Sequence, residues 1–131
     1  MNERDYNAVL TKGRLDNGLI WPVPLSFAPT GKRNEKIVQS LAVGEEIALV
    51  NEANEPIAIL KLDDIFEYDK DYRASHLFGT TYRDHPGVDA IFRRMGVVAL
   101  GGGLSLLQRV DWGPFEKRRL EPKDTWHEFY E

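Results

Sequence analysis

The feature that most constrains the fold is a turn-rich stretch between two amphipathic segments in the second half of the chain. Before it, a helix capped by Asp69 can end at Gly79, because glycine tolerates the left-handed conformation that closes many helices. After it, either Asp84 or His85 can cap a second helix. The apolar face of the first helix consists of Ala74, Leu77 and Phe78, and the second helix carries Pro86 in its first turn, then Val88, Ile91, Phe92 and Met95, with Gly96 at its end. Two short helices joined by a tight connection are therefore predicted.

Strand signals lie on both sides of this helical pair. Residues 45–50 and 56–62 are rich in β-branched side chains and are separated by a polar loop, which predicts a hairpin. Residues 97–100 and 104–110 flank three consecutive glycines, and two strands meeting at a glycine bend is the simplest interpretation. Strands with helices inserted between them favour an α+β sheet of barrel-like form.

The first forty residues give weaker signals. Apolar residues at helical spacing predict a short leading helix that ends at Gly13: Tyr6, Val9 and Leu10. A tight turn at 16–18 and a short strand at 19–21 follow, and that strand should lie at the rim of the barrel because Pro22 and Pro24 cannot donate to a sheet ladder. Residues 29–40 predict a polar connection with one helical turn at 36–38.

The last segment, 121–131, begins like a helix with Pro122 in its first turn. Trp126, Phe129 and Tyr130 fall on one side of that helix. An aromatic face at the end of the sequence needs a partner to cover it.

Composition excludes several classes of protein. A chain of 131 residues with 42% hydrophobic and 29% charged residues fits one globular domain, and it has no apolar run of the roughly 20 residues that cross a bilayer. Zero cysteines exclude disulfides and thiolate metal sites, and the N-terminus lacks the apolar core of a secretory signal, so a cytoplasmic location is predicted. The net charge of −4 opposes general attraction to nucleic acid, with local exceptions at 32–33 and 117–119.

The turn-rich stretch, 78–88, resembles the F-G-T-T-x-x-x-H-P-G-V segment in the N-terminal PUA-like domain of ATP sulfurylase (sulfate adenylyltransferase). Residues 14–24 resemble the opening R-L-x-x-G-x-x-W-P-x-P of that family, and 44–49 resemble its first sheet strand. Residues 119–122 are similar to the R-L-x-P that leads into its catalytic domain. The match runs in order along nearly the whole chain.

The resemblance implies a single PUA-like domain over 1–131, in which 121–131 resembles the start of a linker to an absent catalytic domain. The matched positions are interpreted as residues that determine the shape of the domain: Trp21, Pro22, Pro24, Phe78, Gly79, Thr80, Thr81, His85, Pro86, Gly87 and Val88.

Three groups of residues could carry chemistry, and each has a simpler structural explanation. His85 beside Asp84, with His76 nearby, could be an acid–base pair or half of a metal site, but a helix cap explains the pair without a ligand. Glycines 101–103 could cradle a phosphate, but a strand rather than a helix follows them. The acidic run at 63–71 lacks the spacing and central glycine of a calcium loop. No catalytic residue, cofactor site or metal site is therefore predicted.

The nucleotidyl-transfer motifs of the family are missing. ATP sulfurylases join ATP and sulfate into adenylyl sulfate and pyrophosphate, and the family carries Q-x-R-N and H-x-x-H runs in its catalytic domain. Neither run occurs here, since the residues after Gln39 and Gln108 do not match the first and the three histidines are too far apart for the second. Phosphoryl chemistry needs clustered positive charge, which these motifs would supply.

Three functional hypotheses follow. The first is a non-catalytic N-terminal domain of a sulfate adenylyltransferase, which packs against a catalytic domain in cis or in trans and helps to form a subunit interface, with a homo-oligomer among its candidate assemblies. The second is a stand-alone PUA-like module that binds RNA through Lys117, Arg118 and Arg119 near the aromatic residues Trp112, Phe115 and Trp126. The third is a small-molecule enzyme that uses Asp84 and His85, for which no constellation is complete. The first is favoured, and net acidity counts against the second.

Overall fold

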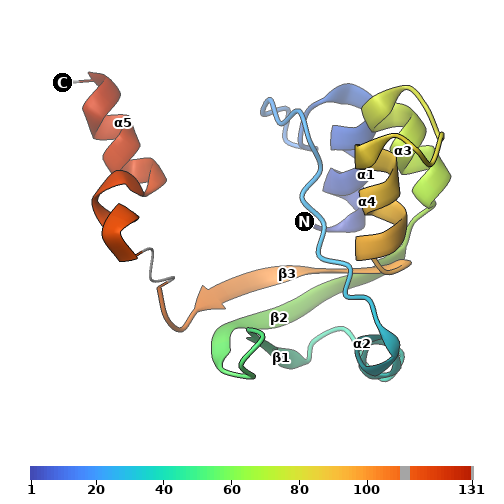
Figure 1. Cartoon of the computed structure of the whole chain (residues 1–131), viewed down its shortest axis with the longest axis horizontal. Coiled ribbons are helices and arrows are strands. Elements are labelled where there is room, and N and C mark those ends of the chain that lie inside the picture. The colour runs from blue at the N-terminus through green and yellow to red at the C-terminus, as the bar shows by residue number, and fades with distance from the viewer. Residues whose placement is uncertain (110–112, 131) are drawn as a thin grey trace.

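One antiparallel sheet of three strands forms the centre of the molecule (Figure 1). The computed structural model describes residues 1–109 and 113–130. The strands are β1 (Glu46–Val50), β2 (Pro56–Glu67) and β3 (Val98–Leu106), paired in the order β1-β2-β3. The predicted hairpin is confirmed as β1 and β2, although β2 is a single strand that continues well past residue 62.

A bulge in β2 gives its two halves different faces. Leu62 pairs with Gly102 while Asp64 pairs with Gly101, so Asp63 is an extra residue that the register skips. Because side chains alternate along a strand, the extra residue lets Leu62 and Ile65 point to the same side of the sheet. Phe66 then points to the opposite side.

The prediction of two strands meeting at a glycine bend is wrong, because β3 runs without a break through all three glycines. Glycine is needed at two of these positions because other backbone atoms approach the strand closely, and not because the strand bends. A Cβ on Gly102 would lie 1.9 Å from the carbonyl oxygen of Lys61, and one on Gly101 would lie 2.8 Å from the carbonyl oxygen of Met1. These glycines are required where the bulge and the N-terminus press against the strand.

Helices cover the two faces of the sheet unequally. α1 (Glu3–Lys12), α3 (Lys70–Phe78) and α4 (Pro86–Arg94) lie together on one side, and α2 (Lys32–Val38) lies on the other (Figure 1). Three clusters of buried residues form the core. One lies where α1 meets the sheet (Tyr6, Leu10, Ala28, Phe66 and Ala99), and one lies where α2 meets it (Val38, Leu60, Leu62 and Leu100). The third joins α3 to α4 (Ala74, Val88 and Ile91). The α+β class is confirmed. Over 1–109 and 113–130 the three strands form an open sheet rather than a closed barrel.

Most predicted helices are confirmed, with two corrections. α1 ends at Gly13 and α3 at Gly79, both with positive φ (64° and 68°), as the sequence predicts. α4, however, ends at Arg94 with Met95 already extended, and Gly96 serves close packing instead, since a Cβ there would lie 2.3 Å from the carbonyl oxygen of Pro29. α2 is a full helix of seven residues rather than one turn.

The strand predicted at 19–21 is reduced to a single bridge between Arg14 and Ile20. Gly18 has a φ of 90°, and the Trp21 N–H donates to the Gly13 carbonyl at 2.9 Å, so the segment closes a local loop. Pro22 follows at once and cannot extend a ladder.

The C-terminal part contains the 3₁₀ helix η1 (Gly113–Arg118) and the helix α5 (Pro122–Tyr130), which confirms the helix predicted there. α5 lies beyond the end of β3 and away from the other helices (Figure 1). Its aromatic residues are exposed: Trp126 by 60%, Phe129 by 79% and Tyr130 by 73%. Residues 110 and 112, which the sequence analysis placed in a strand and an aromatic group, lie outside the described part, as does Glu131. No helix in the described ranges is long and apolar enough to span a bilayer.

We predict that Gly102→Ala destabilises the domain by about 1–3 kcal/mol, because the new methyl group would clash with the Lys61 backbone. Gly103→Ala is the matched control, since no heavy atom lies within 4 Å of the position that its methyl group would take and its φ is not positive. Urea unfolding of both variants gives the comparison. Equal stability of the two variants would contradict the packing role given to Gly102.

Val88→Asp should destabilise the domain by about 3–5 kcal/mol, because Val88 is fully buried and an unpaired carboxylate would replace it. His85→Ala should cost about 0.5–2 kcal/mol, since only a cap at the start of α4 is lost. Thermal melts of the two variants measure the difference. A Val88→Asp protein as stable as the parent would mean that the α3–α4 cluster contributes little to folding.

Candidate functional site

The stretch 78–88 forms a compact connection held by its own side chains. The His85 Nδ1 accepts the N–H of Gly87 at 3.2 Å, so His85 rather than Asp84 caps α4. The Thr80 hydroxyl oxygen accepts the N–H of Tyr82 at 3.1 Å. Thr81 and Asp84 are exposed.

Phe78 packs across this connection. Its ring centroid lies 4.9 Å from that of His85, and a Cβ on Gly87 would lie 2.4 Å from the Phe78 Cζ atom. A side chain at position 87 would have to displace the ring from this place. The last residue of α3 therefore rests on the first turn of α4, and the cluster holds the two helices at a defined angle.

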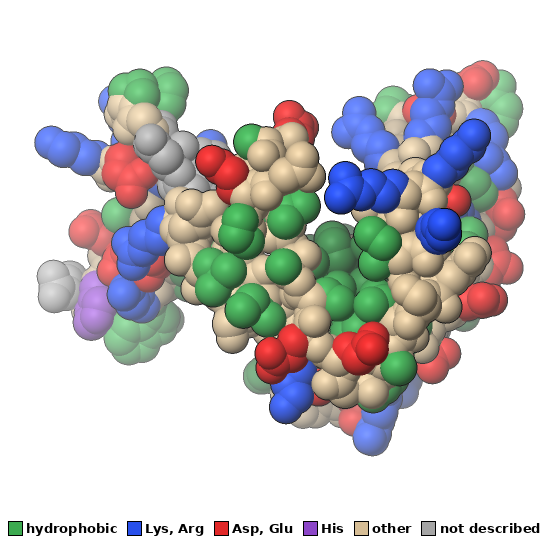
Figure 2. Space-filling view, turned by 90° about the horizontal axis from the view of Figure 1, so that it is seen from below, with side chains coloured by type: hydrophobic (Ala, Val, Ile, Leu, Met, Phe, Trp, Pro, Cys, Tyr) green, Lys and Arg blue, Asp and Glu red, His purple; other side chains and the backbone are tan. Residues whose placement is uncertain are grey.

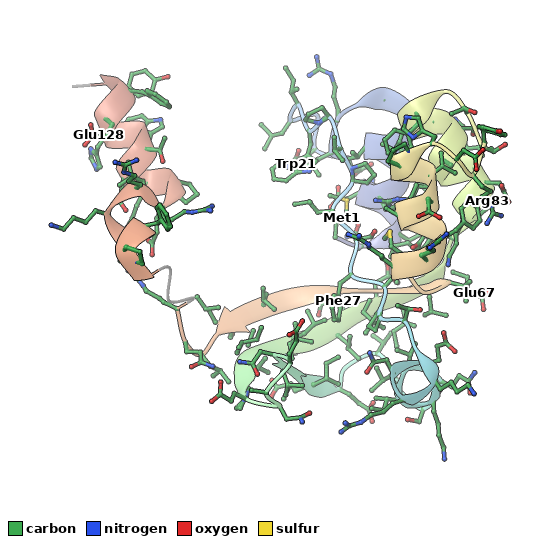
Figure 3. All side chains as sticks on the ribbon, viewed as in Figure 1. Met1, Trp21, Phe27, Glu67, Arg83 and Glu128 are labelled. Carbon is green, nitrogen blue, oxygen red and sulfur yellow. The ribbon has the colours of Figure 1, made fainter. Side chains whose placement is uncertain are left out.

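The second motif segment, 14–24, follows α1 and is held to it, since the Asp16 N–H donates to the Asp5 carboxylate at 3.0 Å. Trp21 is only partly covered, with 39% of its surface exposed, whereas Pro24 is fully buried. Figure 3 shows Trp21 on the same side of the sheet as α1, and Arg83 near the outer edge of the helical layer. Both sets of motif residues therefore lie among the helices rather than around one cavity.

Arg73 is a buried cation that the sequence analysis missed. Its Nη1 donates to the Ser26 hydroxyl at 3.1 Å and its Nη2 donates to the Pro24 carbonyl at 3.2 Å. Its guanidinium also lies over the rings of Tyr6 and Tyr68, at 5.4 and 5.8 Å from their centroids. Arg73 thus ties the irregular segment at 24–26 to α3. No local signal could have found this role, because arginine on a helix is ordinarily exposed.

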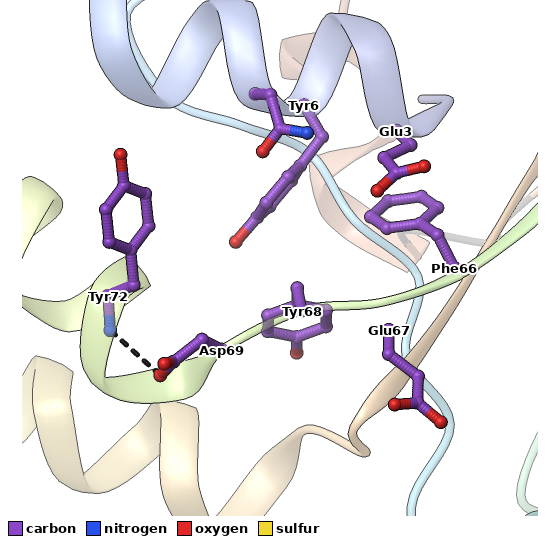
Figure 4. Close-up of a pocket in the computed structure, with 8 residues that line it drawn as sticks. Glu3, Tyr6, Phe66, Glu67, Tyr68, Asp69 and Tyr72 are labelled. Atoms are coloured by element: carbon purple, nitrogen blue, oxygen red, sulfur yellow. Dashed lines mark hydrogen bonds between the residues drawn. The ribbon is translucent and has the colours of Figure 1, made fainter.

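A cavity of about 300 Å³ opens between α1 and the start of α3 (Figure 4). Tyr6, Phe66, Tyr68 and Tyr72 form its aromatic lining, and three carboxylates lie at its rim: Glu3, Glu67 and Asp69. The Asp69 Oδ1 accepts the N–H groups of Asp71 and Tyr72 at 2.8 and 3.0 Å, so this carboxylate is already used as the cap of α3. None of the residues drawn in Figure 4 is a nucleophile hydrogen-bonded to a base, which is the arrangement that nucleophilic catalysis would require.

Burial raises the pKa of two of the tyrosines that line this cavity, Tyr6 and Tyr68. Burial is the main cause for Tyr68, whose pKa rises to about 12 although the Arg73 charge opposes the shift. The Tyr68 hydroxyl donates to the Gly96 carbonyl at 3.1 Å. Burial also raises the pKa of Tyr6, again opposed by Arg73. Both phenols stay protonated and act as packing groups at neutral pH.

The other candidate residues of the sequence analysis are dispersed. The three histidines contact different aromatic rings: His76 stacks on Tyr72 at 3.9 Å, His85 on Phe78, and His127 lies beside Trp126 at 6.0 Å. Of the acidic run, the Asp64 carboxylate accepts the N–H of Glu3 at 2.7 Å. In the part of the chain that the structure describes, no three His, Asp or Glu side chains are placed to hold a metal ion.

The basic group proposed for RNA lies in and just after η1. Lys117, Arg118 and Arg119 are all exposed, and Phe115 exposes 60% of its surface in the same helix. Trp112, another aromatic residue of the RNA hypothesis, lies outside the described residues. The RNA hypothesis stays a prediction.

A second hollow lies on the α2 side of the sheet and is apolar. Figure 2 shows hydrophobic side chains gathered on this face and inside the hollow. It measures about 310 Å³, and its lining includes Leu25, Phe27, Leu60, Leu100, Gly102 and Leu104. Ser26, whose hydroxyl accepts from Arg73, also lines the hollow, and the other lining side chains are apolar, so the hollow suits contact with another apolar surface.

Comparisons with known proteins place these features in a family. Residues 1–109 match the family described as PUA-like domain. The sulfate adenylyltransferase of Symbiobacterium thermophilum is 37% identical over 129 residues, which are 98% of this chain and 31% of the relative. Those of Trichormus variabilis (33% identical; 93% and 30% covered) and Aeropyrum pernix (37% identical; 95% and 31% covered) are similar. The resemblance drawn from the motifs is confirmed, and the chain spans about 31% of the length of these relatives.

A solved structure has the same fold. The chain titled hexameric APS kinase from Thiobacillus denitrificans superposes with a TM-score of 0.63 over 99% of this chain and 20% of that one. The two sequences are 18% identical, so this similarity concerns the fold alone.

We expect the free energy of unfolding to fall between about pH 10 and pH 12 as Tyr68 titrates. A pKa raised in the folded state to about 12, from an ordinary 10.0, means that folding favours the neutral phenol; this contribution is complete below pH 10 and is lost as the pH approaches 12. Urea unfolding across this range, with ultraviolet titration of the tyrosines, measures it. Tyr68→Phe should show a smaller fall, whereas the exposed-residue control Tyr82→Phe should behave like the parent. An identical fall in all three proteins would contradict the assignment to Tyr68.

Proposed function

This chain belongs to the PUA-like domain family, and we propose that it serves as the non-catalytic N-terminal domain of a sulfate adenylyltransferase. The observation that carries this proposal is the match of nearly the whole chain to about 31% of several sulfate adenylyltransferases. In the whole enzyme, ATP and sulfate would be joined into adenylyl sulfate with release of pyrophosphate, as part of sulfate assimilation in the cytoplasm.

A non-catalytic role agrees with what the chain's own residues can do. The Q-x-R-N and H-x-x-H runs expected of the catalytic domain do not occur in the sequence. The cations that could have replaced them are used elsewhere or spread over the surface, since Arg73 binds Pro24 and Ser26 and Arg93 pairs with Asp89 at 2.7 Å. Phosphoryl transfer depends on converging positive charge, which this arrangement does not supply.

We assign the motif residues roles in shaping the domain. Gly79, His85 and Gly87 form the connection on which Phe78 packs, and Pro24 supplies a carbonyl to the buried Arg73. Pro86 and Val88 begin α4, with Thr80 holding the turn before it. A domain with a fixed shape can position a catalytic domain without touching substrate.

Two surfaces suit the packing that this function requires. The first is the exposed aromatic face of α5, and the second is the apolar hollow on the α2 side of the sheet. Residues 121–131 would then begin the linker to the catalytic domain. Subunit contacts in a homo-oligomer are proposed to use the same domain, as surfaces of this apolar character are typical of protein interfaces.

The isolated chain is predicted to release no pyrophosphate from ATP in the presence of sulfate and magnesium. A chimera in which this chain replaces the aligned segment of the Symbiobacterium thermophilum relative should release it, because the remaining polypeptide carries the chemistry. The same pyrophosphate assay is applied to both proteins.

A pair of chimera variants tests the role of α5. Phe129→Ser should lower turnover severalfold if the aromatic face packs on the catalytic part, while Tyr82→Ser, at a similarly exposed aromatic residue on the far side of the domain, should not. The proposal is wrong if the isolated chain has turnover that survives repurification and is lost on mutation within it. A folded but inactive chimera also counts against it.

A further inference from the structure

Over part of its length, the outer edge of β3 pairs with no other segment that the structure describes. The Leu107 N–H donates to the Ile57 carbonyl of β2 at 2.9 Å, and Ser105 and Gly103 pair with β2 in the same register. Because backbone groups alternate between the two edges of a strand, those of Gly102, Leu104 and Leu106 point away from β2.

One contact shows that this edge can accept a neighbour. The Leu100 N–H, which has the same orientation, donates to the Phe27 carbonyl at 2.8 Å, forming an isolated bridge. Phe27 lies against the strand in Figure 3. Beyond Leu100, no described segment continues the pairing. A fourth strand beside β3 therefore amounts to this one bridge in the described part of the chain.

The residues with free backbone groups also lie on an exposed apolar surface. Leu104 and Leu106 expose 61% and 63% of their surface on the α2 side of the sheet, where α2 covers only the other end. Because Gly102 has no side chain, it leaves the apolar hollow open between Leu100 and Leu104, and Leu25 and Phe27 line the same hollow. Figure 2 shows apolar side chains inside this hollow.

This edge lacks the usual protection against pairing. Natural edge strands carry lysine, proline or a bulge that prevents another strand from adding. Residues 102–106 are Gly-Gly-Leu-Ser-Leu, with none of these features on β3, and the bulge lies on β2 instead. An exposed edge of this kind is expected to be covered in the functional protein.

We propose that the outer edge of β3 is completed by an extended strand from the polypeptide that follows this domain in the longer relatives. The proposal rests on the proposed function. Its partner is argued from the length of those relatives, in which about two-thirds of the polypeptide lies outside the matched segment. β3 leads into η1 and α5 beyond the same end of the sheet (Figure 1), so a tethered continuation would reach this edge at high effective concentration.

The geometry defines the chemistry of this strand. Its main chain would pair with Gly102, Leu104 and Leu106, the mode in which a peptide extends an existing sheet. Every second side chain would then face the α2 side, so the strand should alternate apolar and polar residues. A large apolar side chain opposite Gly102 would enter the hollow.

Amide hydrogen exchange tests this pairing residue by residue. In the isolated chain, the inward amides of Gly103, Ser105 and Leu107 should be protected and the outward amides of Gly102, Leu104 and Leu106 should exchange rapidly. In the chimera with the Symbiobacterium thermophilum relative, the outward amides should slow by at least about tenfold, because local protection follows from new hydrogen bonds. Docking of side chains alone would not change alternate amides selectively.

Two substitutions at nearby leucines provide matched variants. Leu104→Lys places a charge at the hollow, and it should restore rapid exchange of the outward amides in the chimera. Leu107→Lys places the same charge one residue past the end of β3, where alternation directs the side chain to the opposite face, at a comparably exposed residue, and it should leave the protection in place. Equal effects of the two variants would overturn the proposed face of contact.

Failure of this proposal and failure of the proposed function give different results. If the chimera releases pyrophosphate while its outward amides exchange as in the isolated chain, strand addition is wrong and the proposed function stands. If the chimera folds but is inactive, the proposed function fails, and exchange at the aligned positions of the natural relative still decides whether the edge is covered. Protection that increases with the concentration of the isolated chain would identify a second copy as the partner and overturn this proposal.

Discussion

The pairing of β2 with β3 is the constraint on which the rest of the structure depends. The extra residue at Asp63 shifts the register, so that one pair of strands presents Leu62 to the cluster under α2 and Phe66 to the cluster under α1. Gly102 makes this possible, since any side chain there would clash with the Lys61 carbonyl. A slip of one residue would turn both apolar sets to the wrong faces.

This sheet is only partly covered by the domain that it organises. The helices α1, α3 and α4 bury one side, while α2 protects only part of the other (Figure 1). The remaining apolar surface, the open edge of β3 and the aromatic face of α5 are all directed away from the core. The buried polar groups, such as Arg73, are used to hold the domain's own segments together.

The motifs that identify the family are explained by packing on a small scale. Phe78, His85 and Gly87 meet because a helix end and a helix start are joined by a connection too short to avoid contact. Several of these interactions could be predicted, since the His85 cap, the Asp69 cap and the glycine stop at Gly79 involve residues within a few positions of one another. The role of Arg73 could not, because its partners lie more than forty residues earlier.

The sequence by itself determined α1, α3, α4 and α5, most of their ends, the β1–β2 hairpin and the family resemblance, because caps, turns and periodicity are local properties of the chain. Only the tertiary structure decided the meaning of the glycines in β3 and at Gly96. Glycine is compatible with a bend, a left-handed turn or a close contact, and the choice among these depends on a distant backbone atom, here the carbonyl oxygens of Lys61, Met1 and Pro29. The course of β3 as one strand, and the edge that it leaves open, follow from those contacts, which no local pattern contains.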